Sequence, residues 1–209
     1  LIDMEYWLAC NEERAAQARF GAVCCCGPCA MYRRSVLSLL DQYETQLYRG
    51  KPSDFGEDRH LTILLSAGFR TEYVPSAIAA TVVPDTMGVY LRQQLRWARS
   101  TFRDTLLALP VLPGLDRYPL DAIGQNVGLL LLALSVLTGI GQFALTATLP
   151  WWTILVGSMT LVRCSVAAYR ARELRFLGFA LHTLVNIFLL IPLKAYALCT
   201  LSNSDWLSR

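Results

Sequence analysis

The distribution of apolar and charged positions divides the chain near residue 121. Residues 122–162 form a run of 41 positions without a charged side chain. A transmembrane helix needs about 20 mostly apolar residues to cross a hydrocarbon core about 30 Å thick. The run therefore predicts a hairpin of two membrane-spanning helices, over residues 123–145 and 152–169, with a turn and an aromatic belt at Pro150–Trp152.

Before residue 121 the pattern is mixed. Strong helix formers and capping residues mark some stretches as helices, and β-branched and aromatic residues mark others as strands. The predicted helices cover residues 1–19, 35–48, 57–67 and 87–109. The predicted strands cover residues 20–26, 69–74 and 77–83. This mixture predicts an α/β fold class for residues 1–86.

The predicted helix over residues 87–109 is amphipathic. Its arginines recur at spacings of four, three and four, so they share one face, and apolar residues share the neighbouring face. These arginines are Arg92, Arg96, Arg99 and Arg103. A basic face beside an apolar face is typical of a helix that lies in the membrane interface. Because a long uncharged run follows closely, we favour this interpretation of residues 87–121 over a helix on the surface of a soluble domain.

Residues 174–201 form a third apolar stretch, interrupted by His182, Asn186, Pro192 and Lys194. Ionisable and polar side chains are costly in lipid, so this stretch is less suited to a bilayer than the first two. It is either a third span or an interfacial or re-entrant helix.

The apolar half of the chain is also its basic half. Residues 122–209 hold six basic and two acidic side chains, whereas residues 1–121 hold 13 and 14. This distribution suits contact with anionic lipid, and the formal net charge of +3 is too small to indicate a nucleic-acid partner. By the positive-inside rule, the cluster Arg170, Arg172 and Arg175 places both ends of the hairpin in the cytoplasm.

Four of the seven cysteines crowd into residues 24–29. Adjacent cysteines make a poor disulfide framework, so we expect a reducing compartment or buried thiols. Cys26 and Cys29 have the spacing of half a zinc site, but no second pair accompanies them, and we expect no metal site in this chain. The chain starts at Leu1 without a signal peptide, and we expect it to be a fragment of a longer protein.

Three short strings stand out in order along the chain: GEDR at residues 56–59, QQLRW at 93–97 and WLSR at 206–209. Alone, each has an ordinary structural explanation. Together, around a membrane hairpin, they resemble the processive family 2 glycosyltransferases of membranes, which include cellulose, chitin and hyaluronan synthases. The strings CCCGPCAMYRR, GKPSDFGEDRHLTILL and ALCTLSNSDWLSR resemble more closely the branch that makes the chito-oligosaccharide backbone of rhizobial nodulation factors.

This resemblance implies an architecture. Residues 1–86 would be the C-terminal part of a GT-A-like glycosyltransferase domain, followed by the interfacial helix and linker of 87–121. Residues 122–169 would be the transmembrane hairpin. Residues 170–209 would comprise a basic loop, an interfacial or re-entrant helix and a gating segment. The enzyme would lie in the bacterial inner membrane with its catalytic portion in the cytoplasm.

The resemblance also implies an inverting hexosyltransferase. It would add N-acetylglucosamine from UDP-N-acetylglucosamine, in β-1,4 linkage, to a growing N-acetylglucosamine oligomer at the lipid bilayer. The alternatives are a hyaluronan or long-chitin synthase of the same family, and a non-catalytic membrane scaffold. WLSR differs from the W-G-T-R string of hyaluronan synthases at Leu207 and Ser208, which favours the nodulation branch.

The chemistry requires a base that takes the proton of the acceptor hydroxyl as it attacks the anomeric carbon. By resemblance Asp58 is that base, with Glu57 and Arg59 adjusting its surroundings. The residues expected to bind the donor and its pyrophosphate are Gln93, Arg96, Trp206 and Arg209. Guanidinium groups suit this role because they bind phosphate oxygens bidentately. The residues expected to bind the acceptor are Trp97, Cys26, Gly27 and Pro28.

The chain lacks a D-x-D string and a glycine-rich phosphate loop. The resemblance implies a divalent cation, Mg²⁺ or Mn²⁺, held by carboxylates upstream of residue 1. We therefore expect these 209 residues alone to be inactive. If Trp206 and Arg209 contact the nucleotide, they must be cytoplasmic, so we predict two spans rather than three, with residues 174–201 interfacial or re-entrant.

Overall fold

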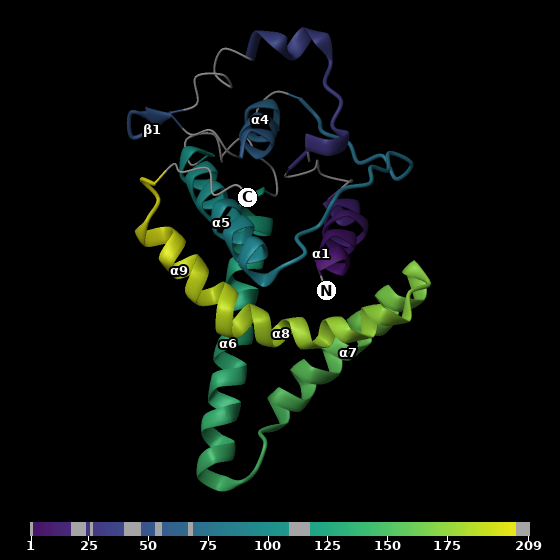
Figure 1. Cartoon of the computed structure of the whole chain (residues 1–209), viewed down its shortest axis with the longest axis vertical. Coiled ribbons are helices and arrows are strands. Elements are labelled where there is room, and N and C mark those ends of the chain that lie inside the picture. Colours follow the sequence, from purple (N-terminus) through teal and green to yellow (C-terminus); the bar gives the residue numbers. More distant parts are fainter. Residues whose placement is uncertain are drawn as a thin grey trace.

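A computed structural model describes the greater part of the chain. The described residues are 2–17, 24–25, 27–39, 47–52, 56–66, 69–108 and 118–203. Helices dominate this part, and an antiparallel pair of two-residue strands is its whole sheet content. In Figure 1 the α6–α7 hairpin forms the lower part, and the segments that carry the site lie above it.

The helices of the first 121 residues follow the predicted pattern closely. The predicted helix 1–19 is confirmed over residues 2–17, which are the bounds of α1 (Ile2–Leu8), the π-helical η1 (Ala9–Arg14) and α2 (Ala15–Gln17). The helices predicted at 57–67 and 87–109 are α4 (Glu57–Ser66) and α5 (Met87–Ala108). Two short 3-10 segments, η2 (Gly27–Cys29) and η3 (Arg34–Leu39), complete this part.

The predicted helix 35–48 is wrong at its end. Leu47–Tyr48 forms β1, which pairs with β2 (Lys51–Pro52) across Arg49 and Gly50. Both turn residues have positive φ, 52° and 77°, which is the backbone of a two-residue type I′ hairpin turn. The turn geometry therefore overrides the helical pattern before it.

The α/β prediction is not confirmed by the described residues. Residues 69–74 and 77–83 form no strand, and their apolar side chains, including Ile78 and Val82, are largely exposed. A strand exists only beside a partner that completes its hydrogen bonds, and no described residue pairs with this stretch. The predicted strand 20–26 falls mostly outside the described residues.

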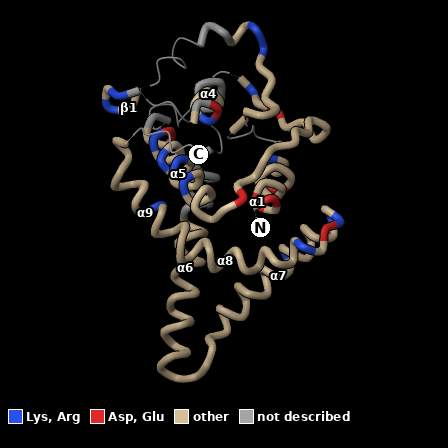
Figure 2. The backbone as a smooth tube through the Cα atoms, viewed as in Figure 1, with Lys and Arg blue, Asp and Glu red and all other residues tan. Residues whose placement is uncertain are grey.

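Three described segments are long and apolar enough to cross a membrane: Val127–Thr146, Trp151–Ala171 and Leu174–Cys199. The first lies in α6 (Tyr118–Thr146) and the second is α7 (Trp151–Ala171), so the predicted hairpin is confirmed by length and composition. Figure 2 shows that the hairpin carries few charges and that the charged residues gather at the other end of the molecule.

The third apolar stretch comprises η5 (Leu174–Leu181), α8 (His182–Val185), η6 (Asn186–Leu190) and α9 (Ile191–Cys199). In Figure 1 it runs across the open end of the α6–α7 hairpin. Its first part packs on α7 and its last part packs on α5. The interfacial or re-entrant placement of this stretch stays a prediction, and its course across the hairpin is compatible with it.

The polar residues of this stretch belong to a buried network. His182, 3% exposed, lies 3.0 Å from the Tyr90 hydroxyl through Nε2 and 2.9 Å from Asn186 Nδ2 through Nδ1. The Tyr90 hydroxyl donates to Glu5 (3.0 Å), and Gln94 donates to the other oxygen of Glu5 (3.1 Å). His182 and Asn186, which make this stretch less suited to a bilayer, therefore belong to a hydrogen-bond network that joins it to α1 and α5.

The hairpin is held close at Gly139 in α6. A methyl group on Gly139 would overlap the Thr153 side chain on α7. Small residues at such positions allow membrane helices to approach closely.

We expect Gly139→Ala to weaken the hairpin by about 1–3 kcal/mol, because the added methyl meets a β-branched side chain that has little room to move. The control is Gly141→Ala, since a Cβ at Gly141 meets nothing within 4 Å. Thermal unfolding of the full-length protein in detergent should separate the two variants. Equal unfolding temperatures would contradict this packing.

Candidate active site

The candidate site forms where the start of α4 packs against α5. Gly56, immediately before α4, has φ of +86°, and a Cβ at this position would overlap Ser100 Oγ on α5. Only glycine combines this backbone conformation with this approach. The close contact brings the first turn of α4, which carries the GEDR string, onto α5.

Asp58 lies in that first turn and is engaged by hydrogen bonds. Its Oδ1 accepts from the Arg59 N–H at 2.8 Å, and its Oδ2 accepts from the Cys24 thiol at 3.6 Å. The Thr62 hydroxyl donates to the Asp58 carbonyl (2.6 Å) and accepts from the Cys25 N–H (2.8 Å). The cysteine-rich segment is therefore bound directly to the turn that carries the predicted base.

Beside this turn the structure places a second carboxyl group that the sequence did not indicate. Asp104 is 1% exposed, and its Oδ2 accepts from Ser100 Oγ at 3.1 Å. Its Oδ1 lies 3.7 Å from His60 Nδ1, and neither atom has a hydrogen-bond partner among the described residues. Burial raises the pKa of Asp104 to about 7, against the opposing effect of Arg59. Burial lowers the pKa of His60, because it disfavours the charged imidazolium.

The remaining predicted residues of α5 extend along the same helix face. Gln93, Trp97, Ser100 and Asp104 follow one another at intervals of four, three and four, which places them on one side of the helix. Trp97 is partly exposed, and its ring meets the edge of Tyr6 at 5.7 Å between centroids. The Gln93 Oε1 is buried without a hydrogen-bond partner among the described residues. At 1.5 Å rise per residue, Trp97 lies about 10 Å along the axis from Asp104.

The structure thus packs the turn that holds Asp58 and Arg59 against Ser100 and Asp104 of α5. Gln93, Arg96 and Trp97 lie on the same helix, about one to two turns before Ser100. Gly27 and Pro28 are exposed in η2, two to four residues after the cysteines that contact α4. Cys26, Trp206, Arg209 and the side chain of Glu57 lie outside the described residues. Asp104 could have been found from its spacing, since it lies seven residues after Trp97 on one helix face.

Two of the four arginines predicted to form a basic face of α5 at the membrane interface are buried inside the protein. Arg99 and Arg103 are buried, with 2% and 1% of their surface exposed, so these two do not point to lipid headgroups. Arg92 is exposed. The prediction that α5 lies in the membrane interface remains untested.

Within the described part of the chain, no three His, Cys, Asp or Glu side chains gather closely enough to hold a metal ion. The carboxylates at the site do not fit a divalent cation either, because Asp104 faces His60 and Ser100 rather than a shared centre. A metal held by residues outside this chain stays a prediction.

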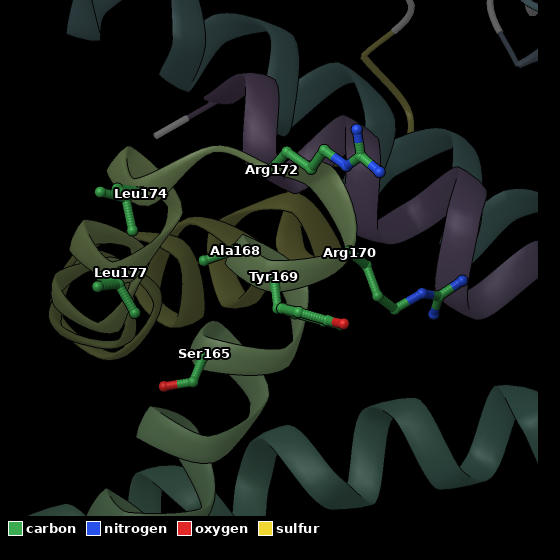
Figure 3. Close-up of a pocket in the computed structure, with 7 residues that line it drawn as sticks. All are labelled: Ser165, Ala168, Tyr169, Arg170, Arg172, Leu174 and Leu177. Carbon is green, nitrogen blue, oxygen red and sulfur yellow. The ribbon is translucent and has the colours of Figure 1, made fainter.

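A separate pocket lies where α7 meets η5 (Figure 3). Its lining residues are Ser165, Ala168, Tyr169, Arg170, Arg172, Leu174 and Leu177. In Figure 3 the two leucines lie on one side and both guanidinium groups extend away on the other. None of the predicted site residues lines this pocket.

We expect Gly56→Ala to destabilise the protein by about 1–3 kcal/mol, because the new methyl strains the left-handed backbone and overlaps Ser100. Gly88→Ala is the control, since its Cβ meets only the end of Arg92, at 3.9 Å. Thermal unfolding of the full-length protein measures the difference. A Gly56→Ala protein as stable as the control would contradict the close approach of α4 to α5.

We expect Asp104→Asn to change the pH dependence of stability. A raised pKa means that, between about pH 4 and pH 7, the folded protein holds a proton that the unfolded chain has released. Stability is therefore lost as pH rises through this window and levels off above about 7. Asparagine stays neutral, so the unfolding temperature of the variant relative to wild type should increase by a few degrees between pH 5 and pH 8. Because the lowered pKa of His60 acts in the opposite direction, the two proteins are compared at each pH. A pH-independent difference would contradict a buried, protonatable Asp104.

Comparison with known proteins shows which proteins this chain is similar to. Residues 1–100 match the family model described as glycosyltransferase like family 2. Over its full length the chain is 97% identical to an N-acetylglucosaminyltransferase of Rhizobium leguminosarum bv. viciae. It is 83% and 75% identical to proteins of the same name from Sinorhizobium fredii and Bradyrhizobium diazoefficiens.

The chain covers 50%, 52% and 44% of these three relatives, so it spans about half the length of the curated relatives it matches. The match to the family model includes α4 and most of α5, which are the two helices that form the candidate site. The chain belongs to the family 2 glycosyltransferases.

Proposed function

We propose that this chain is part of a membrane glycosyltransferase that transfers N-acetylglucosamine from UDP-N-acetylglucosamine to a growing chito-oligosaccharide. The observation that carries the proposal is the docking of the turn that holds Asp58 onto the helix that holds Gln93, Arg96 and Trp97. The relatives are named N-acetylglucosaminyltransferase, which supports N-acetylglucosamine as the sugar that is transferred. The nodulation-factor backbone is the proposed product.

In the proposed reaction an oxygen of the acceptor sugar attacks the anomeric carbon of the donor from the face opposite the pyrophosphate. The bond between the anomeric carbon and the phosphate oxygen breaks, so the configuration inverts. Asp58 takes the proton of the attacking hydroxyl, which prevents positive charge from building on that oxygen. Asp58 is suited to this role because its two oxygens already accept hydrogen bonds from Arg59 and Cys24, which orient the carboxylate.

The leaving group is UDP, and its developing negative charge requires fixed cations. Arg96 on α5 and Arg209 are the proposed contacts for the pyrophosphate, with Gln93 and Trp206 beside them. Trp97 is proposed to bind the acceptor, because its ring is partly exposed on the face of α5 that leads to α4. The segment of Cys26, Gly27 and Pro28 would complete the acceptor site. Glu57 would act on Asp58 through its charge.

The enzyme is proposed to act at the bacterial inner membrane with α4 and α5 on the cytoplasmic side. The arginines at and after the end of α7 support this orientation through the positive-inside rule. A divalent cation would balance the donor phosphates, held by residues outside this chain.

We expect Asp58→Asn in the full-length enzyme to lower kcat by about 10²–10⁴-fold, because an amide cannot accept the hydroxyl proton. Binding of UDP should remain within about twofold of wild type. The matched control is Asp85→Asn, which changes an exposed carboxylate outside the site. The measurement is incorporation of radiolabelled N-acetylglucosamine into oligomers, with mixed UDP-sugars offered to separate chitin from hyaluronan products. Normal transfer by Asp58→Asn would disprove the role of the base.

A further inference from the structure

Two buried arginines of α5 hold the chain that follows α9. Arg103 donates from Nε to the Leu201 carbonyl at 2.8 Å and from Nη2 to the Asn203 carbonyl at 2.7 Å. Arg99 donates from Nε and Nη2 to the Thr200 hydroxyl, at 3.2 and 2.9 Å. Two guanidinium groups one helical turn apart therefore fix three of four consecutive residues.

The surroundings of these arginines explain how two cations are tolerated in a protein interior. A buried charge is costly unless hydrogen bonds and nearby negative potential compensate it. The hydrogen bonds come from the Thr200 hydroxyl and the Leu201 and Asn203 carbonyls, directly after α9. The dipole of α9 adds partial negative charge at this end of the helix. Arg103 also lies over the Tyr48 ring at 5.1 Å, and Arg99 lies over the Tyr196 ring at 6.0 Å.

The arrangement relates two groups of residues that the proposed chemistry needs. Arg96 and Arg103 are seven residues apart on α5, which is about 10 Å along one face of the helix. Trp206 follows Asn203 by three residues, so an extended chain reaches at most about 10 Å from the held carbonyl. Holding residues 200–203 at the Arg103 end of α5 thus keeps the start of the following segment about 10 Å along the helix from Arg96.

We propose that Arg99 and Arg103 are positioning residues that hold residues 200–203 against α5, so that the donor-binding residues after them begin at a set distance from Arg96. The inference rests on the proposed function for its effect on catalysis. Its structural part, the attachment of residues 200–203 to α5, can be tested without any activity.

The kinetic test uses Arg103→Gln in the full-length enzyme. Loss of the charged contacts should raise the KM for UDP-N-acetylglucosamine about tenfold or more, while the KM for an acceptor oligomer stays within about twofold. A general loss of folding would reduce the amount of active enzyme and leave both KM values unchanged. The matched control is Arg92→Gln, an exposed arginine of the same helix that should behave as wild type.

A second variant approaches the contact from its other side. Thr200→Val removes the hydroxyl that Arg99 binds and keeps the shape of the side chain, so it should raise the donor KM in the same direction by a smaller factor. Arg103→Lys keeps the charge but cannot bind both carbonyls in the same planar fork, and it should fall between wild type and Arg103→Gln. If neither Arg103→Gln nor Thr200→Val moves the donor KM, the positioning role is wrong.

The structural test is hydrogen exchange of the full-length protein in detergent. Amides of residues 200–203 should exchange faster in Arg103→Gln and Thr200→Val, while those of α6 stay unchanged. Unchanged exchange at residues 200–203 would overturn the attachment itself. If wild type transfers no N-acetylglucosamine but the exchange result holds, the proposed function fails and the attachment stands.

Discussion

The structure depends on one helix, α5, which is engaged by protein on several of its sides. On one side Gly56 admits the start of α4 against Ser100, and on another Arg99 and Arg103 bind the chain after α9. Near its beginning Tyr90 and Gln94 bind Glu5 of α1. Because three segments distant in sequence converge on this helix, a displacement of α5 would change every part of the candidate site together.

Polar groups, rather than a large apolar core, specify this convergence. The apolar cluster formed by α1, α7 and η5 includes Met4, Leu8 and Phe176, and it lies beside the hairpin rather than at the site. Among the described residues of α5, most of the buried side chains are polar, and Ala98 is the apolar exception. The polar ones are Tyr90, Gln94, Arg99, Ser100, Arg103 and Asp104. Buried polar groups must be satisfied by particular partners, so they define a position more narrowly than apolar contacts do. Such precision suits a site that must align a base, a leaving group and an acceptor.

Much of this organisation is readable from the order of residues. The helices at residues 2–17, α4, α5 and the hairpin follow from periodicity and from uncharged length, because local propensity and lipid compatibility act over short stretches. The strings around Asp58 and Arg96 indicate a family 2 glycosyltransferase for the same reason, since a motif is local. The strands predicted at residues 69–74 and 77–83 are wrong, because a strand depends on a partner elsewhere in the chain, which no local pattern supplies.

The sequence by itself determined which segments are helical, which are apolar enough for a bilayer and which residue types carry the chemistry. Tertiary structure alone decided what those residues face. The four-residue arginine pattern of α5 is compatible with headgroups or with a protein partner, and only the folded chain assigns Arg99 and Arg103 to residues 200–203. Asp104 likewise becomes part of the site only because Gly56 lets His60 approach it. These pairings join residues about 40 to 100 positions apart, and contacts at that separation arise from packing, which periodicity cannot encode.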